Sequence, residues 1–165
     1  MAVVNMAHIA AVTLALFAAS MAVAEGTNVA FGGLKADTKL PVEMKSDALS
    51  INQADGNAVF SGNVIVTQGA MKLSAAEIRV EYSTDKKAIE KLYATGGVLL
   101  VNASDAAQAD QAIYTISSGE VVMTGNVLLT QGQAAMSAQK LIIDLKSGTG
   151  RMEGRVTTTF TPGAN

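Results

Sequence analysis

The sequence predicts an all-β protein, an elongated jelly roll or sandwich built from repeated antiparallel strand units. Residues 60–69 (FSGNVIVTQG) recur almost unchanged at 123–132 (MTGNVLLTQG). Turn-forming residues separate short runs of alternating apolar and polar residues about every 8 to 12 residues, which is typical of an all-β fold. A Gly-x-Val signature also occurs four times, starting at Gly62, Gly96, Gly125 and Gly154.

The repeat aligns without gaps at an offset of 63 residues, the difference between positions 60 and 123. Upstream, the same offset carries Asp47 onto Asp110. The shared unit spans roughly 35 residues, which indicates a duplicated supersecondary element. Each unit exposes one apolar face and must pair with its neighbours to bury it. The repeat therefore lengthens a single apolar wall.

Each Gly-x-Val segment is predicted to be a strand with one apolar face, because side chains two apart point the same way. In the first copy this face holds Phe60, Gly62, Val64 and Val66, so Asn63 is expected on the opposite face. The corresponding apolar stripes of the other copies lie within residues 92–100, 121–129 and 152–160. A glycine on the apolar face is expected to mark a bend or a close approach by another backbone or a ligand.

Further strands are predicted between these segments. Polar Glu77, Arg79 and Glu81 alternate with apolar residues over 77–82, and residues 141–145 alternate in the same way. The alanine-rich stretch 102–112 is interpreted as a loop leading into a strand, in preference to a helical turn. The first and last strands are expected to remain open edges that can pair with another chain.

The first 24 residues are predicted to be a secretory signal peptide. Residues 9–19 are almost wholly apolar and are too short for a membrane span, and Ala22-Val23-Ala24 fits a cleavage site. An uncleaved anchor is the alternative. The predicted division of the chain is a signal peptide (1–24), a flexible N-terminal segment (25–37), a β domain (38–162) and a C-terminal tail (163–165).

Composition excludes several function classes. The net charge of −2 does not suit a protein that binds nucleic acid through phosphates. The chain has no cysteine, and its one histidine, His8, lies in the predicted signal peptide. Without these residues the predicted mature chain lacks the commonest nucleophiles, general bases and transition-metal ligands. We therefore expect no enzyme activity, no metal and no cofactor; a hydrolase using serine and carboxylates is disfavoured.

The strand pattern resembles the OstA-like family of periplasmic lipopolysaccharide-transport bridge proteins. FSGNVIVTQG (60–69) is the centre of the resemblance. Residues 40–47 resemble the family's first mature strand, residues 121–127 its second Gly-Asn strand and residues 155–158 its closing strand. The similarity covers about residues 38–162 and departs from the family pattern over 91–110. It implies a twisted β-jelly roll, open at both ends.

The resemblance also implies a function. The chain would be a periplasmic carrier and bridge that shields lipid A acyl chains in an apolar groove between the inner and outer membranes. Its N-terminal end would meet an inner-membrane-anchored partner of the same fold, and its C-terminal end the periplasmic domain of the outer-membrane translocon. Protomers would also associate end to end. The alternative is a structural strand-repeat scaffold or assembly subunit that binds only protein.

In the family the core and the ligand groove are the same surface, whereas the residues alone fit an ordinary sandwich core. Tyr82 and Tyr114 are expected to place their hydroxyls at the rim. Lys35, Lys39 and Lys45 are candidates for lipid A phosphates, although they also fit a solvated surface. The residues predicted to line the groove are Val42, Met44, Leu49, Ile51, Phe60, Val64, Val66, Ile78, Val80, Val98, Leu100, Tyr114, Met123, Val127, Leu129, Leu141 and Ile143.

Overall fold

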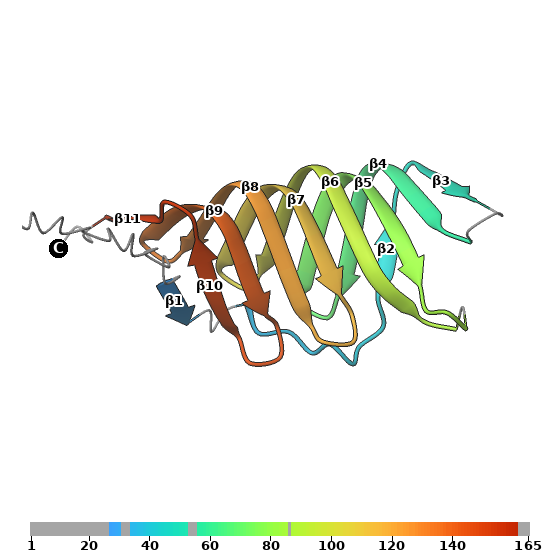
Figure 1. Cartoon of the computed structure of the whole chain (residues 1–165), viewed down its shortest axis with the longest axis horizontal. Coiled ribbons are helices and arrows are strands. Elements are labelled where there is room, and N and C mark those ends of the chain that lie inside the picture. The colour runs from blue at the N-terminus through green and yellow to red at the C-terminus, as the bar shows by residue number, and fades with distance from the viewer. Residues whose placement is uncertain (1–26, 31–33, 53–55, 86, 162–165) are drawn as a thin grey trace, which may run out of the picture.

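The structure, a computed structural model, describes residues 27–30, 34–52, 56–85 and 87–161. The predicted signal peptide and the predicted C-terminal tail lie outside these residues. The described chain forms one elongated antiparallel sheet of eleven strands (Figure 1), which confirms the all-β prediction. The strands are β1 (Thr27–Ala30), β2 (Glu43–Lys45), β3 (Ala48–Ile51), β4 (Ala58–Gln68), β5 (Met71–Tyr82), β6 (Ile89–Asn102), β7 (Asp105–Thr115), β8 (Glu120–Gln131), β9 (Ala134–Asp144), β10 (Thr149–Glu153) and β11 (Thr157–Phe160).

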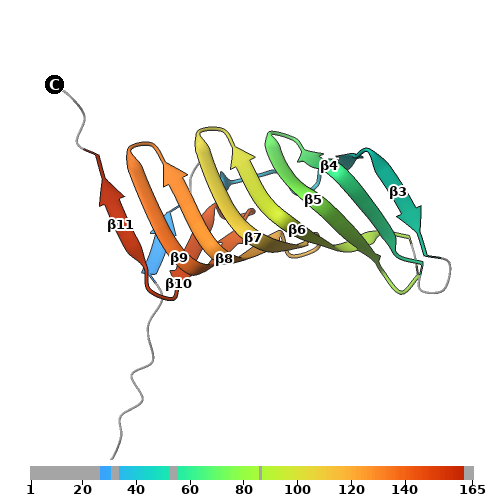
Figure 2. The same cartoon turned by 90° about the horizontal axis from the view of Figure 1, so that it is seen from above.

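Strands β4 to β9 form a continuous meander in which each strand pairs with the next. At one end, β2 and β3 pair with different parts of β4. At the other end, β10 and β11 pair with different parts of β9, and β1 pairs with β10. Figure 2 shows the resulting row of strands from above, with β3 at one end and β11 at the other.

The sheet divides into two half-sheets because each long pairing is interrupted near its middle by a β-bulge. The register shifts between Ser61 and Val64 of β4, for example, and between Thr124 and Val127 of β8. A bulge bends its strand and increases the local twist. Half-sheet A comprises β1, β3, β10 and residues 58–61, 77–82, 89–95, 111–115, 120–124 and 140–144; half-sheet B comprises β2, β11 and residues 64–68, 71–75, 98–102, 105–109, 127–131 and 134–138.

All four Gly-x-Val signatures lie at this bend. Gly62 and Asn63 both have positive φ, 76° and 47°, and Gly125 and Asn126 repeat this at 80° and 46°. Asparagine is one of the few residues with a side chain that tolerates this left-handed conformation. The signature therefore encodes the place where the sheet folds back on itself.

The structure corrects the predicted orientation of the glycine. A Cβ atom at Gly62 would lie 2.6 Å from Oδ2 of Asp47, whose side chain is exposed. Gly62 therefore does not face the apolar interior. Strict alternation fails here because the bulge inserts residues 62 and 63 opposite the single residue Ala76. The close approach is made by an aspartate side chain, and Asn63 is exposed as predicted.

The predicted loop over 102–112 is wrong. β6 ends at Asn102, Ala103 and Ser104 form the turn, and β7 begins at Asp105. Alanine is depleted in strands generally, which made the segment difficult to identify. Its small side chains are buried here: Ala107 pairs with Leu100 on one side and Leu129 on the other, and is fully buried.

The core lies between the facing half-sheets. Its fully buried side chains come from both, for example Val66 and Leu129 of half-sheet B and Met123 and Ile143 of half-sheet A. The outer face is polar or half-exposed, as the Arg79–Glu81 and Arg151–Glu153 ion pairs show. The molecule is therefore an unclosed twisted sheet folded over on itself, with a mouth along the side opposite the bend.

Residues 34–42, which we call the strap, lead from the C-terminal end of the sheet toward β2. Figure 1 shows this segment running along the edge of the molecule opposite the bend. Flexibility was predicted for residues 25–37; within that range the structure has β1, paired with β10, and the fully buried Leu34. The strap therefore lies where the two half-sheets would otherwise leave the interior open.

Candidate functional site

Most of the predicted groove residues meet in the interior. Three of them, Val42, Met44 and Phe60, are partly buried against the core. Leu49 and Ile51 pair in register with Phe60 and Ala58, so they share the inner face, but at the open edge they remain 53% and 64% exposed. The fully buried members are Val64, Val66, Ile78, Val80, Val98, Leu100, Tyr114, Met123, Val127, Leu129, Leu141 and Ile143.

The prediction missed a second set of interior residues on the strands between the Gly-x-Val strands. In β5 the buried positions are 71, 73 and 75 before the bend, and 78 and 80 after it. The inward-facing residues therefore change from odd to even numbers at the bend. The same change occurs in β7 and β9. The sequence signal that could have identified these residues was the alternation of inward and outward positions on each side of the bend, taken separately. The missed residues on β5, β7 and β9 are Met71, Leu73, Ala75, Ala107, Ala109, Ala112, Met136 and Ala138. Leu34 on the strap and Ala58 on β4 were missed as well.

The interior is apolar and closely packed. Val66, Leu100 and Leu129 are 0% exposed, as are Ile78 and Met123 from the opposite half-sheet. Methionines at 71, 123, 136 and 152 contribute unbranched side chains that can change shape. Such a surface offers an apolar ligand a wall without fixed polar chemistry, provided that the half-sheets separate.

The mouth of the fold has two lips, one from each half-sheet. Lip A consists of residues 83–85 and 87–88 together with the turns at 116–119 and 145–148. Lip B consists of the turns at 69–70, 103–104 and 132–133. The strap is bound to both. The Ala36 amide donates to the Leu145 carbonyl of lip A (2.9 Å). The Asn102 side chain, next to lip B, donates to the Lys35 carbonyl (2.8 Å).

A buried polar pair joins the half-sheets directly beneath the strap. The Tyr114 hydroxyl, from half-sheet A, donates to Oε1 of Gln68, from half-sheet B (2.6 Å). Nε2 of Gln68 then donates to the Thr38 and Leu40 carbonyls of the strap, at 3.1 and 2.9 Å. Burial raises the pKa of Tyr114 to about 12 because it disfavours the phenolate. Tyr114 is only 1% exposed and its hydroxyl lies beneath the strap, whereas Tyr82 is half-buried against the core.

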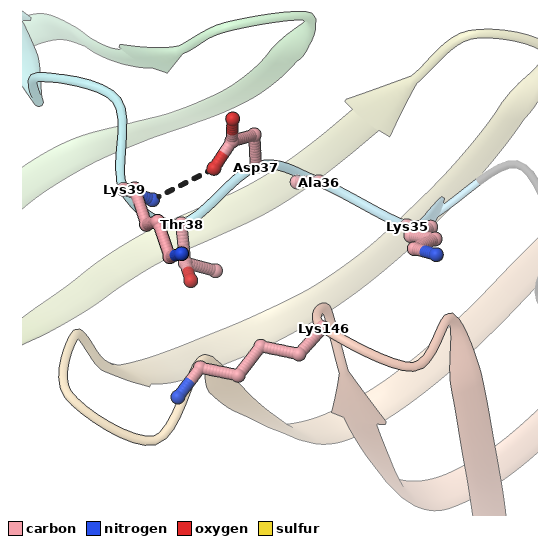
Figure 3. A pocket seen from close by; sticks show the side chains of 6 residues that line it. All are labelled: Lys35, Ala36, Asp37, Thr38, Lys39 and Lys146. Atoms are coloured by element: carbon pink, nitrogen blue, oxygen red, sulfur yellow. Dashed lines mark hydrogen bonds between the residues drawn. The ribbon is translucent and has the colours of Figure 1, made fainter.

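A cavity of about 530 Å³ lies between the strap and the β9–β10 turn. Lys35, Lys39 and Lys146 line it together with Ala36, Asp37 and Thr38. Figure 3 shows Lys146 extending along the gap below the strap, with Lys35 toward its other end. Lys35 and Lys39, two of the three lysines predicted to contact phosphate, therefore line this cavity. The third, Lys45, lies exposed on β2.

The charge around this cavity is positive. Asp37 accepts a hydrogen bond from the Lys39 amide (3.0 Å), and the Lys146 amine donates to the Ser117 carbonyl (2.7 Å). Hydrogen bonds from the Ser147 and Lys146 amides lower the pKa of nearby Asp144, which stays ionised. Within the described chain, none of the three lysines forms an ion pair with a carboxylate. Their amines therefore remain available to an anion.

Both ends of the sheet expose apolar side chains on edge strands. Leu49 and Ile51 lie on β3, and Phe160 on β11 is 73% exposed. An edge strand presents unpaired backbone donors and acceptors and is a template for pairing with another chain. The two ends therefore carry the features that strand addition uses.

In the described part of the chain, acidic, histidine and cysteine residues form no group of three or more that could hold a metal ion. Within the same residues, no helix has the length and apolar character needed to cross a membrane.

Comparisons with known proteins agree with this fold. The model of the LptA/(LptD N-terminal domain) LPS transport protein family matches residues 43–149. An uncharacterized protein of Rhizobium meliloti (strain 1021) is 27% identical over 112 residues, which is 64% of this chain. The chain spans only 60% of the length of that relative.

A solved structure supports the same grouping at the level of the fold. LptH of Pseudomonas aeruginosa, the LptA-homologous periplasmic component of a lipopolysaccharide transport device, superposes with a TM-score of 0.68 at 17% identity. The match covers 77% of this chain and 99% of LptH. The resemblance to OstA-like proteins of the LptA type is thereby confirmed. The chain belongs to the LptA/LptD N-terminal domain family of LPS transport proteins, a transport and binding family without enzymatic activity.

Proposed function

We propose that this protein carries lipopolysaccharide across the periplasm, with the acyl chains of lipid A held between the two half-sheets. The observation that carries the proposal is the continuous apolar interior, built from both half-sheets along the whole row of strands. Burying an acyl chain there contributes about 0.8 kcal/mol for each CH2 group. The mechanism is passive, because the chain supplies an apolar path and energy comes from elsewhere.

The lysine-lined cavity is the proposed place for the phosphorylated headgroup. It lies at the mouth, so a lipid with its chains between the half-sheets would have its headgroup near the strap. Lysine ammonium groups attract phosphate strongly. Because the cavity is open to solvent, these ammonium groups stay hydrated and mobile, so they can move toward a bound phosphate.

The proposed partners follow from the open ends. The β2 and β3 end would add to a membrane-anchored partner of the same fold, and the β11 end to the periplasmic domain of an outer-membrane translocon. Copies of the chain would join end to end by the same strand addition. The exposed Leu49, Ile51 and Phe160 side chains support this assignment, since strand addition would cover them.

A scaffold that binds only protein is the second candidate function. The close packing of the interior favours it, because a core with side chains at 0% exposure needs no ligand to be complete. Both candidates use the open edges, so oligomer formation does not separate them. Binding of lipopolysaccharide by the purified protein does.

The cellular test is depletion of the protein in the bacterium that makes it. Newly made lipopolysaccharide is expected to accumulate at the inner membrane, with the surface supply falling as the protein disappears. Undiminished delivery to the surface would contradict the transport function. Re-expression from a plasmid is the matched control and is expected to restore delivery.

A further inference from the structure

We infer that the strap is a releasable lid over the mouth, and that the interior admits a lipid only after the strap leaves both lips and the half-sheets separate about the bend. The inference rests on the proposed function for the identity of the ligand. The movement itself rests on the contacts of the strap. Release of the strap explains how the interior opens, which the apolar character of the interior does not explain by itself.

The closed form leaves no room for an acyl chain in its interior. Side chains from opposite half-sheets fill the interior, and Val66, Met123 and Leu129 are 0% exposed. An interior packed to the density of an organic crystal cannot accept an acyl chain without moving its walls. Binding of a lipid therefore requires a second, wider arrangement of the half-sheets.

The two half-sheets can part at the mouth but not at the bend. Ladder hydrogen bonds join strands within each half-sheet, and the half-sheets share backbone at the bend. Consecutive residues with positive φ, such as Gly96 and Gly97 at 82° and 83°, lie along this bend. Separation at the mouth leaves the ladders intact, whereas separation at the bend would break the chain's own strands. The bend is therefore the hinge side.

A small set of hydrogen bonds holds the mouth closed. The strap is tied to lip A by the Ala36–Leu145 bond and to half-sheet B by Gln68 and Asn102. The Tyr114–Gln68 bond links the half-sheets directly. Besides apolar contacts such as that of Leu34, these bonds oppose opening. Each joins a side chain or a strap amide, and none belongs to the pairing of β4 to β9.

The strap is anchored in the sheet by a strand on each side of it. β1, before it, pairs with β10 of half-sheet A, and β2, after it, pairs with β4 of half-sheet B. The strap can therefore leave the lips while both flanking strands stay in the sheet. A lid attached at both ends returns to the same register after each opening.

A disulfide between the strap and lip A tests the lid. The chain has no native cysteine. Cγ2 of Thr38, on the strap, lies 3.1 Å from the position that a Cβ would take at Gly119 of lip A, which is within reach of a disulfide. In the double variant Thr38→Cys/Gly119→Cys, which keeps all three lysines of the cavity, oxidation is expected to reduce capture of purified lipopolysaccharide at least tenfold, and reduction to restore it. Equal capture by the oxidised and reduced forms would overturn the lid. Each single cysteine variant, treated with the same oxidant, is the control.

Hydrogen exchange on the lipid-free protein tests the movement without any lipid. Tyr114→Phe removes only the hydroxyl that binds Gln68. The loss of one buried hydrogen bond is expected to raise the exchange rate of the Ala36 amide about fivefold, while amides in the middle of β6 and β8 remain protected. If Ala36 exchanges only together with those core amides, the strap does not open and the inference is wrong. If no variant captures lipopolysaccharide, the proposed function fails, and the exchange experiment still decides about the lid.

Discussion

Asn63 donates a hydrogen bond of 2.8 Å from Nδ2 to Oδ2 of Asp47, and Asn126 makes the same bond with Asp110 at 2.9 Å. In each pair the two residues are 16 positions apart. The 63-residue repeat carries one pair onto the other, since 47 and 63 become 110 and 126. The repeated motif thus encodes a bend in which an aspartate packs over a glycine. The asparagine that follows the glycine donates a hydrogen bond to this aspartate.

Gly62→Ala should destabilise the protein more than Gly132→Ala. Both glycines have positive φ, 76° and 56°, so both variants incur about 1–2 kcal/mol for placing a Cβ in the left-handed region. At Gly62 the new Cβ also meets Asp47 at 2.6 Å, whereas at Gly132 it meets nothing within 4 Å. We expect a further loss of about 1–3 kcal/mol in the free energy of unfolding for Gly62→Ala alone. Equal losses in urea titrations of the two variants would contradict this account of the bend.

Stability should fall at high pH through Tyr114. Its folded-state pKa, about 12, lies above the ordinary value of 10.0. The unfolded chain therefore loses the proton first, so this contribution is complete below pH 10 and decreases as the pH rises toward 12. The measurement is the urea midpoint between pH 9 and pH 11.5. Tyr114→Phe removes this group while the lysines still titrate, so the variant should show a shallower decline; parallel curves would contradict the assignment.

The exposed phenylalanine of β11 should support end-to-end association. Phe160→Asp puts a charge on an edge strand that the proposed contact covers, and we expect the sedimentation-velocity distribution to shift toward monomer. Leu128→Asp is the matched control, because Leu128 is 38% exposed on β8 in the middle of the sheet. Association that is lost equally in both variants would show that the β11 edge is not the contact.

Binding of lipopolysaccharide should depend on the lysines of the cavity. Replacing Lys35, Lys39 and Lys146 by glutamine is expected to weaken binding by roughly fivefold per lysine, given about 1 kcal/mol per basic side chain near an anionic lipid. The control replaces Lys45, Lys72 and Lys91, which changes the net charge equally away from the cavity.

The comparison of the two triple variants also needs a dephosphorylated lipid A. With that lipid the cavity variant and the parent should bind alike. The headgroup assignment would be wrong if the control variant weakened binding as much as the cavity variant, or if the cavity variant weakened binding of the dephosphorylated lipid to the same extent.

The sequence predicted the strands on either side of each Gly-x-Val but not the geometry at the bend. Alternation identified Val64, Val66 and Met123 as inward residues, because strict period-two patterning holds on each side of a bulge. It placed Gly62 on the apolar face, because a bulge breaks the period without changing composition. It assigned residues 102–112 to a loop, because Ala107 and Ala109 contribute to burial through their small size, which a hydrophobic stripe does not reveal.

The strap could not be predicted from periodicity. Residues 34–42 have no regular strand pattern, and their position depends on side chains far along the chain, such as Gln68 and Asn102. Gln68 belongs to the repeated Thr-Gln-Gly sequence, whose composition indicates a turn and not a buried polar residue. Only the three-dimensional arrangement brings it beneath the strap and opposite Tyr114.

The central claim is that lipid lies between the half-sheets and not on the outer surface. Adjacent residues on one strand provide the most direct test, since they differ in the face that they occupy. Phe60 pairs with inward Ile78, and its neighbour Val59 pairs with outward Arg79. A photo-crosslinking amino acid at position 60 is expected to label lipopolysaccharide in living cells, and one at position 59 to label little or none. Equal labelling at the two positions would contradict the claim.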